Sequence, residues 1–318
     1  MVPNKKNIII VAHDGGELAN QIWNHISVFA YACDRGYGCI NHSFFEHARS
    51  FDNLSEGSLI SRIFSLPYYR SRLRKTSLFI RLWRKFYKLS VVKPVLWLGG
   101  DKVVYSNDEG EVYYLPPTAP AAEKLSVHEA SMGDFYFASV SGGVFRNATG
   151  IELHRVRVVE SMRPAAHIRA KVDSIISPLR SMYAEIVAVH VRQTDYKTFK
   201  GGKYYVAPER AAEIMREYLN VMGKKVADVC FVVTTDESIS ETVFKGLNVI
   251  ISRNDVVTDL FTLASCDALI GSDSTLGHFA SYYGDIPHII MKNEDMDWSY
   301  YRDKERYFVN KYLTVMRY

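Results

Sequence analysis

The sequence predicts an α/β protein built from two domains that face each other across a cleft. Its 318 residues are about twice the ~150 residues of an ordinary domain. Strand-like apolar runs alternate with helical stretches throughout the second half, and the chain opens with a unit of the same kind. Such alternation is typical of a parallel sheet covered by helices. Hydrophobic residues make up 47% and charged residues 23%, a composition that excludes a disordered chain.

The first predicted strand is NIIIVAH at residues 7–13, followed by a polar loop and a helix over residues 20–35. Ile22, Ile26, Phe29 and Cys33 recur on one face of this helix, and Gly36 follows as a stop signal. The opening apolar run is too short for a secretory signal or a membrane span. No later stretch is long enough to cross a bilayer, so we expect a cytoplasmic protein.

The region 45–130 has no regular pattern, and the Gly and Pro pairs between Gly99 and Pro120 indicate loops and short strands. Within it, residues 62–93 form a basic segment with ten lysines and arginines, several aromatic residues and no acidic residue. One interpretation is a solvated amphipathic helix. The other is contact with an anionic surface, such as the inner membrane leaflet or a pyrophosphate-linked acceptor. Nucleic acid is less favoured because no nucleic-acid-binding module accompanies the segment.

The second half predicts five strands separated by helical stretches. The strand IVAVHV at residues 186–191 leads into a polar loop over 192–205, and a helix follows from Pro208 to Met222. The later strands are DVCFVVTTD, NVIIS, DALIGS and PHIIM, with helices expected from Ser238, from Thr258 and from Ser274 to near Gly284. Ligands of such sheets bind at the carboxyl ends of the strands. The polar residues at or just beyond these ends are Arg192, Asp195, Asp236, Ser272 and Thr275.

The strongest single motif is HVRQTDY at residues 190–196, which leaves the end of a predicted strand. An arginine in this position can direct two hydrogen bonds onto phosphate oxygens, and an aspartate three residues later can orient it. By itself, the motif favours the plainer interpretation, a salt bridge between Arg192 and Asp195 that only closes the strand end.

Two further stretches favour a phosphate site. The loop GGELANQ at residues 15–21 joins a strand to a helix, and the run 258–280 contains a Ser-Asp-Ser-Thr turn that opens another helix. Backbone N–H groups at a helix start bind phosphate readily. Together, the three stretches resemble the fucosyltransferase superfamily, which includes bacterial α-1,2-, α-1,6- and protein O-fucosyltransferases. The matching residues are Gly15, Gly16, Asn20, Gln21, His190, Arg192, Asp195, Asp259, Leu260, Asp267, Ile270, Ser274 and Thr275, and the run 135–145 is similar to a segment of the bacterial members.

The resemblance implies a GT-B-like fold, in which two Rossmann-like domains face each other. Residues 1–160 would form an acceptor-side domain that includes the basic segment, and residues 161–318 a domain that binds the GDP-sugar. The last helix is a candidate to pack back on the N-terminal domain. The implied reaction is an inverting transfer of fucose from GDP-fucose to a glycan hydroxyl, without a metal ion.

The resemblance also assigns roles to individual residues. Arg192 would bind the pyrophosphate, His190 and Asp259 would face the nucleoside, and Asp259 would accept hydrogen bonds from guanine. The implied donor-binding set is Gly15, Gly16, His190, Arg192, Asp236, Asp259, Ser272, Ser274 and Thr275, with Ser274 and Thr275 at the β-phosphate. The implied catalytic set is Arg192, Asn20 and Asp195, with Asn20 near the reacting sugar. His13, Asp14 and Glu17 are candidate bases by position only.

Three positions depart from the pattern of the superfamily. Gln193 stands where many members have a second arginine, Ala19 replaces a loop glycine, and Asp273 adds a negative charge to the expected phosphate turn. Two other hypotheses therefore stay open. One is transfer from another GDP-deoxysugar, and the other is a non-catalytic scaffold that binds a glycan or nucleotide.

A metal site is not expected. Asp295 and Asp297 have the DxD form of metal-dependent transferases, but they follow the last predicted strand. His25, His278 and His288 lack ligand spacing, and four cysteines without CxxC spacing predict buried free thiols. The expected partners are a GDP-sugar and a glycan or lipid-linked glycan acceptor in surface polysaccharide synthesis, with peripheral contact at the inner face of the membrane through 62–93.

Overall fold

The computed structural model describes residues 8–11, 17–36, 38–41, 47, 50–52, 89–90, 104–105, 135–138 and 148–302. The predictions for His13, Asp14, Gly15 and Gly16, for nearly all of the basic segment, and for a last helix after residue 302 lie outside these residues. The chain divides into two compact units, Met1–Ala165 with Met316–Tyr318, and Ala166–Val315.

The described part of the first unit contains a parallel sheet in the order β2-β1-β4-β3. Its strands are β1 (Ile8–Val11), β2 (Gly38–Asn41), β3 (Val104–Tyr105) and β4 (Phe135–Ala138), and Ile8 is paired with both Gly38 and Phe135. Helix α1 (Leu18–Arg35) joins β1 to β2 and packs on α7 (Ala148–Leu153) and α8 (Arg155–Ser161). Ile22 and Ile26 are fully buried, and α1 ends at Gly36, whose φ of 68° is left-handed. The predicted strand, helix and stop signal are confirmed.

The second unit is organised around a parallel sheet in the order β7-β6-β5-β8-β9. Its strands are β5 (Glu185–Val191), β6 (Val229–Thr235), β7 (Val249–Ile251), β8 (Ala268–Gly271) and β9 (His288–Ile290), as predicted. The order runs outward from β5 to β7 and then returns to the other side of β5 with β8. The switch point of the sheet therefore lies between β5 and β8.

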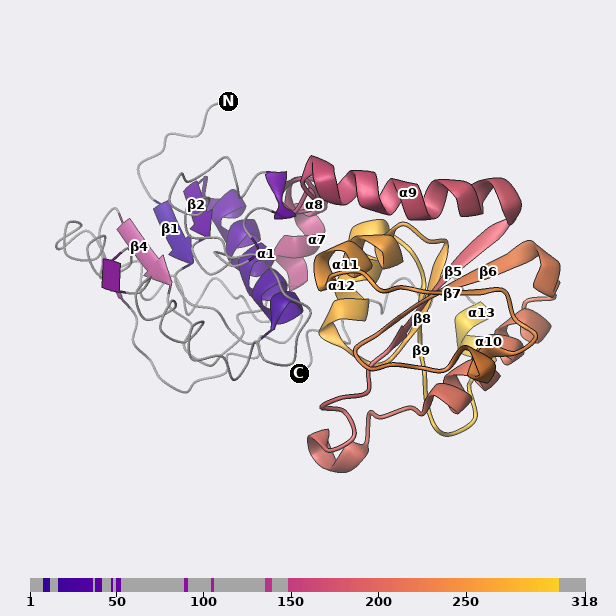
Figure 1. The fold of residues 1–318 in the computed structure, drawn as a ribbon. Helices are drawn as coiled ribbons and strands as arrows, with labels where there is room; N and C mark the ends of the chain where they lie inside the picture. Colours follow the sequence, from indigo (N-terminus) through magenta and orange to yellow (C-terminus); the bar gives the residue numbers. More distant parts are fainter. Residues whose placement is uncertain are drawn as a thin grey trace. The chain divides into compact units, whose positions relative to one another are not determined.

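Helices cover both faces of this sheet (Figure 1). Helices α9 (Ala166–Met182), α11 (Val256–Ala264) and α12 (Thr275–Gly284) lie on one side, and α10 (Pro208–Val221) and α13 (Trp298–Arg302) lie on the other. The α10 side encloses a core of fully buried residues from the strands and the helix, including Val189, Phe231, Ile270, Ile214 and Met215. Short 3-10 helices occupy Phe199–Gly202, Val226–Asp228 and Glu241–Phe244.

Four details differ from the sequence predictions. The helix expected from Ser238 is a single 3-10 turn at Glu241–Phe244, and α11 begins at Val256 because Asp255 caps it, not at Thr258. Helix α9 was not predicted. Cys230 and Cys266 are buried free thiols, whereas Cys33 and Cys39 are partly exposed. Within the described residues, no helix is both long and apolar enough to span a membrane.

Candidate functional site

The carboxyl ends of β5 and β8 are joined by Ser272, which directly follows β8. The backbone N–H of Ser272 donates to the carbonyl oxygen of His190 at 2.9 Å, and its Oγ accepts from the backbone N–H of Arg192 at 3.0 Å. Ser272 is completely buried. Its hydroxyl therefore fixes the point at which the chain leaves β5, at the switch point where ligands of such sheets bind.

Arg192 is held by two carboxylates at this point. Its Nε and Nη2 donate to the two carboxylate oxygens of Asp195 at 2.8 and 3.1 Å, and Asp236 lies 3.8 Å from Nε. Burial lowers the pKa of the guanidinium, but the hydrogen bonds and charges of the carboxylates outweigh burial and raise it. Arg192 is therefore a fixed cation whose side chain is still 23% exposed.

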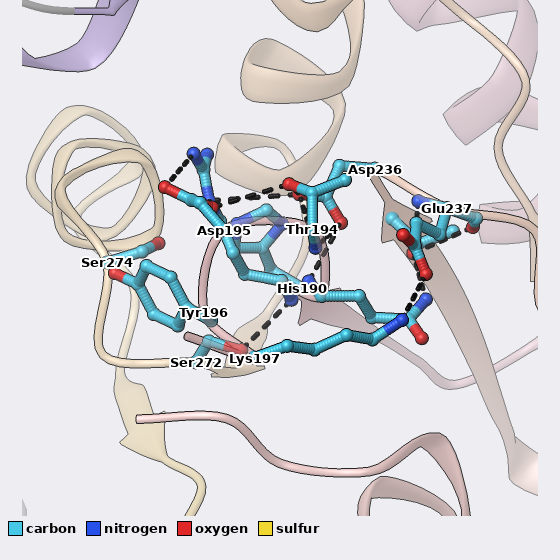
Figure 2. A network of polar contacts seen from close by, with 12 residues as sticks. His190, Thr194, Asp195, Tyr196, Lys197, Asp236, Glu237, Ser272 and Ser274 are labelled. Carbon is cyan, nitrogen blue, oxygen red and sulfur yellow. Dashed lines mark hydrogen bonds and ion pairs between the residues drawn. The ribbon is translucent and has the colours of Figure 1, made fainter. Parts of the chain in front are cut away.

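Asp236 shapes the loop that carries Arg192. It follows β6 and accepts hydrogen bonds from the backbone N–H groups of Gln193 at 2.8 Å and Thr194 at 3.3 Å, and from the Thr194 hydroxyl (Figure 2). Gln193 is 5% exposed and donates to Thr235 Oγ1 at 3.0 Å. Gln193, which stands where many members of the superfamily have a second arginine, thus connects the loop after β5 to the end of β6.

The turn after β8 opens helix α12. Ser274 caps this helix by accepting the N–H of Gly277 at 3.2 Å, and Thr275 is the first helical residue. The carboxylate of Asp273 bonds to His278 Nε2 at 2.8 Å, one turn along the helix. The charge that was unexpected in a phosphate turn is therefore engaged by a histidine. The helix start presents backbone N–H groups and a partial positive charge to an anion.

Tyr196 links the two loops and was not among the residues selected from the sequence. Its hydroxyl donates to the carbonyl oxygen of Asp273 at 2.8 Å, and Arg192 Cζ lies 5.5 Å from the centre of its ring. The signal that could have identified it is its place in the motif HVRQTDY, four residues after the arginine. A large hydroxylated ring there can reach across to the next strand end.

His190 and Asp259 are both buried. His190 shares a 3.1 Å hydrogen bond between Nδ1 and the Thr234 hydroxyl, and its Nε2 has no partner among the described residues. Burial, with a further contribution from the Arg192 charge, lowers the pKa of His190 to about 4. Asp259 lies in the first turn of α11 and accepts from the Ser252 hydroxyl, to which Asn254 Nδ2 donates at 2.9 Å.

The predicted site residues therefore divide into three groups. The structure brings together His190, Asp195, Asp236, Ser272 and Ser274 at the carboxyl ends of β5, β6 and β8 (Figure 2). Arg192 joins them through its contacts with Asp195, Asp236 and Ser272, and Thr275 follows Ser274 at the start of α12. Asp259 lies beyond β7, in a separate polar cluster with Ser252. Asn20 is in the first turn of α1 in the first unit, and Gly15 and Gly16 lie outside the described residues.

Two motif residues have structural contacts away from this site. Asp267 precedes β8 at the amino ends of the strands, opposite the site, where it accepts hydrogen bonds from the Ile186 N–H at 2.8 Å and from Arg180. Asp297 accepts from the Ser299 hydroxyl at 2.5 Å. Among the residues that the structure describes, no three His, Cys, Asp or Glu side chains gather as a metal site would require.

Comparison with known proteins gives a match in fold without a match in sequence. No protein-family profile and no curated protein sequence matches the chain. The structure is similar to POFUT1 in complex with GDP-fucose, with a TM-score of 0.54 and 12% identity over 90% of this chain and 98% of that chain. It is similar to the fucosyltransferase NodZ from Bradyrhizobium, with a TM-score of 0.52 and 15% identity over 92% and 97%.

A third similar structure is FUT1 of Arabidopsis thaliana in complex with GDP, with a TM-score of 0.52 and 12% identity over 92% of this chain and 71% of that chain. The chain therefore has the mixed α/β fold of solved fucosyltransferase structures. At these identities the likeness is one of fold, and the resemblance derived from the sequence motifs is confirmed at that level.

Proposed function

We propose that this protein transfers fucose from GDP-fucose to a hydroxyl group of a glycan, with inversion at the sugar and without a metal ion. The proposal includes a GT-B arrangement, with the donor in the second unit and the acceptor presented by the first, and a role in surface polysaccharide synthesis in the cytoplasm. Its support is the shared fold, the structures of that fold solved with GDP or GDP-fucose, and the site around Arg192.

The observation that carries the proposal is the preset guanidinium of Arg192 at the switch point of the sheet. Asp195 occupies its Nε and one hydrogen of Nη2. The Nη1 side remains for two hydrogen bonds to a diphosphate, and no described residue bonds to it. Charge-assisted bonds of this kind contribute roughly 1.5 to 3 kcal/mol each.

The formal charges of the side chains do not make this site cationic. Arg192, Asp195 and Asp236 have a combined formal charge of −1, so a bound diphosphate needs further stabilisation. The N-terminus of α12, which begins four residues after the end of β8, would supply it through its first backbone N–H groups and its dipole. The donor site is therefore proposed to lie between the Arg192 loop and the Ser274 turn.

The same two elements would lower the barrier of the reaction. When the bond between the sugar and GDP breaks, negative charge grows on the β-phosphate, and fixed donors placed there stabilise the transition state. The acceptor hydroxyl would attack the opposite face of the sugar, which gives inversion. Asn20 and the candidate bases His13, Asp14 and Glu17 belong to the first unit, from which the acceptor would be presented.

The test is thermal stabilisation of the purified protein by GDP, UDP, CMP and their sugar derivatives in excess EDTA. A ligand at about 100 times its dissociation constant adds roughly 2.7 kcal/mol to the stability of the folded state. We expect stabilisation by GDP and GDP-fucose that is lost in Arg192→Ala. Arg216→Ala is the matched control, because among the described residues Arg216 donates only to the carbonyl oxygens of Val243 and Lys245, away from the proposed donor site.

Two further readouts separate the competing hypotheses. The rate of GDP release from GDP-fucose, compared with the rates from GDP-mannose and GDP-rhamnose, identifies the sugar that is transferred. The anomeric configuration of the product distinguishes inversion from retention. If UDP stabilises the protein only with Mn²⁺, the fucosyltransferase proposal is wrong. GDP binding without sugar transfer to any acceptor would favour the scaffold.

A further inference from the structure

Tyr196 joins the two elements that are proposed to hold the donor. It lies in the loop after β5, four residues beyond Arg192, and its hydroxyl donates to the carbonyl oxygen of Asp273 at 2.8 Å. Asp273 belongs to the turn between β8 and α12. In Figure 2 the Tyr196 ring points from the loop toward the turn that carries Ser274. The hydroxyl of Tyr196 thus connects the arginine loop to the turn that opens the helix.

Aromatic contacts fix the Tyr196 ring in this position. Its ring centre lies 5.9 Å from that of Phe199, with the two rings stacked at 20°, and 6.2 Å from that of Tyr204. The Cζ atom of Arg192 lies 5.5 Å from the centre of the Tyr196 ring. The ring cannot swing away from the turn without breaking these contacts. It therefore orients both its own hydroxyl and the guanidinium beside it.

The hydroxyl of Tyr196 keeps its proton. Burial raises the pKa of Tyr196 to about 12, and the negative charges of Asp273 and Asp195 oppose the lowering effect of Arg192. A protonated hydroxyl can donate to a carbonyl oxygen, whereas a phenolate could not. The contact with Asp273 is therefore retained at neutral and at moderately alkaline pH.

The turn is also held by contacts of its own. The Asp273 carboxylate bonds to His278 Nε2 at 2.8 Å, and Ser274 caps α12. Both contacts lie within the turn and the helix that follows it, so they set the shape of the turn but not its distance from the loop after β5. The Tyr196 hydroxyl acts between the two elements, together with the Ser272 hydroxyl at their base.

A diphosphate depends on the separation of these two elements, and a monophosphate does not. In the proposed donor site, Arg192 and the start of α12 act on the same pair of phosphate groups, so both must stand at the right distance at once. A monophosphate can bind to either element alone, whatever the distance between them. Ordering two elements at the moment of binding costs free energy, and elements that are ordered beforehand avoid that cost.

We propose that Tyr196 is a positioning residue that makes the site selective for a diphosphate over a monophosphate. It acts through Arg192 and through the turn at Asp273, whose separation it fixes. This inference rests on the proposed function, in which the site holds the diphosphate of a GDP-sugar. Its consequence is a site that binds GDP more tightly than GMP.

The experiment measures the dissociation constants of GDP, GMP and inorganic pyrophosphate by calorimetry in excess EDTA. Tyr196→Phe removes the hydroxyl and keeps the ring beside Arg192. Tyr218→Phe is the matched control, because the Tyr218 hydroxyl donates to Glu185 Oε1 at 3.0 Å at the start of β5, opposite the site. Each variant loses one tyrosine hydrogen bond, and urea unfolding measures the stability that is lost with it.

We expect wild type to bind GDP more tightly than GMP. Tyr196→Phe should weaken the binding of GDP and of pyrophosphate by about three- to tenfold, the range for one lost hydrogen bond, and leave GMP binding within about twofold of wild type. Tyr218→Phe should leave all three dissociation constants unchanged, although both variants should unfold at a lower urea concentration.

Unchanged binding of GDP and pyrophosphate in Tyr196→Phe would overturn the inference. Equal weakening of GMP would also overturn it, because the hydroxyl would then support the whole site and not the distance between its two elements. Equal weakening in Tyr218→Phe would do the same, since lost stability would be the cause. If wild type binds pyrophosphate but not GDP, and Tyr196→Phe weakens pyrophosphate binding, the proposed function alone is wrong. Failure of wild type to bind either ligand would refute both.

Discussion

Arg192 and Asp195 form two parallel hydrogen bonds, of 2.8 and 3.1 Å, within a single turn of the chain after β5. The pair is local in sequence, and Asp236 from the neighbouring strand fixes the backbone between the two residues. The guanidinium is therefore oriented before any ligand arrives. Such preorganisation reduces the entropy that a ligand must lose on binding.

Replacing Arg192 with lysine should weaken GDP binding even though the charge is kept. A lysine cannot bond to both oxygens of Asp195 and to a diphosphate at the same time. We expect the dissociation constant of GDP, measured by calorimetry, to rise by about tenfold or more, corresponding to ~1.5 kcal/mol or more. Arg216→Lys should leave it unchanged, and an unaltered affinity in Arg192→Lys would show that the guanidinium geometry is irrelevant to binding.

Asp236 should contribute to stability through the loop that it holds. Asp236→Ala leaves the N–H groups of Gln193 and Thr194 without their acceptor, and we expect a loss of about 1 to 3 kcal/mol in unfolding free energy. Asp236→Asn retains an oxygen acceptor and should lose less. Urea unfolding of both variants checks this difference. Equal losses would indicate that the charge near Arg192, and not the backbone contacts, is what matters.

Two substitutions of Ser274 separate its role as the cap of α12 from its proposed role in binding the donor. Ser274→Ala removes the cap of α12 and should cost about 1 kcal/mol, whereas Ser274→Gly should cost only a few tenths. Both variants lack the hydroxyl proposed to bind the β-phosphate. We therefore expect both to show weaker GDP stabilisation, while only the alanine variant unfolds at lower urea concentration. Wild-type GDP stabilisation in the glycine variant would exclude the hydroxyl from the donor site.

Gly284 is required for the close approach of α11 and α12. A Cβ at this position would lie 2.0 Å from the carbonyl oxygen of Ala264, a backbone atom that cannot move aside without shifting the helix. We expect Gly284→Ala to lower the unfolding free energy by about 3 kcal/mol. Gly223→Ala is the control, since Gly223 has a φ of 65° with open space around it and should cost about 1 kcal/mol. Similar losses in the two variants would contradict the packing argument.

Buried histidines should make stability depend on pH. Burial lowers the pKa of His25 and of His190 to about 4, and burial, with contributions from nearby His278 and His190, lowers that of His288 well below its ordinary value. The unfolded chain, with histidine pKa values near 6.5, binds protons that the folded state excludes. The contribution of these histidines to the unfolding free energy should therefore be constant above pH 7 and fall as the pH drops from about 6.5 toward 4. Each such histidine adds a slope of up to ~1.4 kcal/mol per pH unit.

The test of this pH dependence is urea unfolding at a series of pH values between 7 and 5. His288→Leu should reduce the slope by about the contribution of one proton, because neither ring nitrogen of His288 has a partner among the described residues. An unchanged slope in the variant would mean that His288 does not stay neutral in the folded state.

Much of the second unit could be predicted from the sequence because its signals are local. Continuous apolar runs rich in β-branched residues set the buried strands, Pro208 and Gly223 bracket α10, and the three-residue spacing of Arg192 and Asp195 matches one turn of a loop. Helix α9 carries a one-face signal in the buried residues Ile168, Val172, Ile176 and Leu179, but Pro178 lies inside the helix and argues against a helix in the sequence alone. The turn at Glu241–Phe244 is too short for periodicity to distinguish a 3-10 turn from an α-helix.

Contacts between distant segments were not accessible in this way. Gly284 was predicted as a helix stop, and α12 does end there. The left-handed residue, however, is Asp285, and the lack of a side chain at Gly284 leaves room for the backbone of Ala264. Gln193 stands where many members of the superfamily have a second arginine, and only the structure shows that its side chain bonds to Thr235. Asp273 was an unexplained charge until the structure placed it against His278.

The sequence by itself determined the α/β class, the strand ends that carry polar residues and the arginine motif, because these depend on neighbours within a few positions. The tertiary structure alone decided which strand ends meet. With the order β7-β6-β5-β8-β9, the ends of β6 and β8 flank that of β5, and residues more than forty positions apart, such as Gln193 and Asp236, come within a hydrogen bond. Strand order is a property of the whole packed sheet, so no local pattern could have specified those partners.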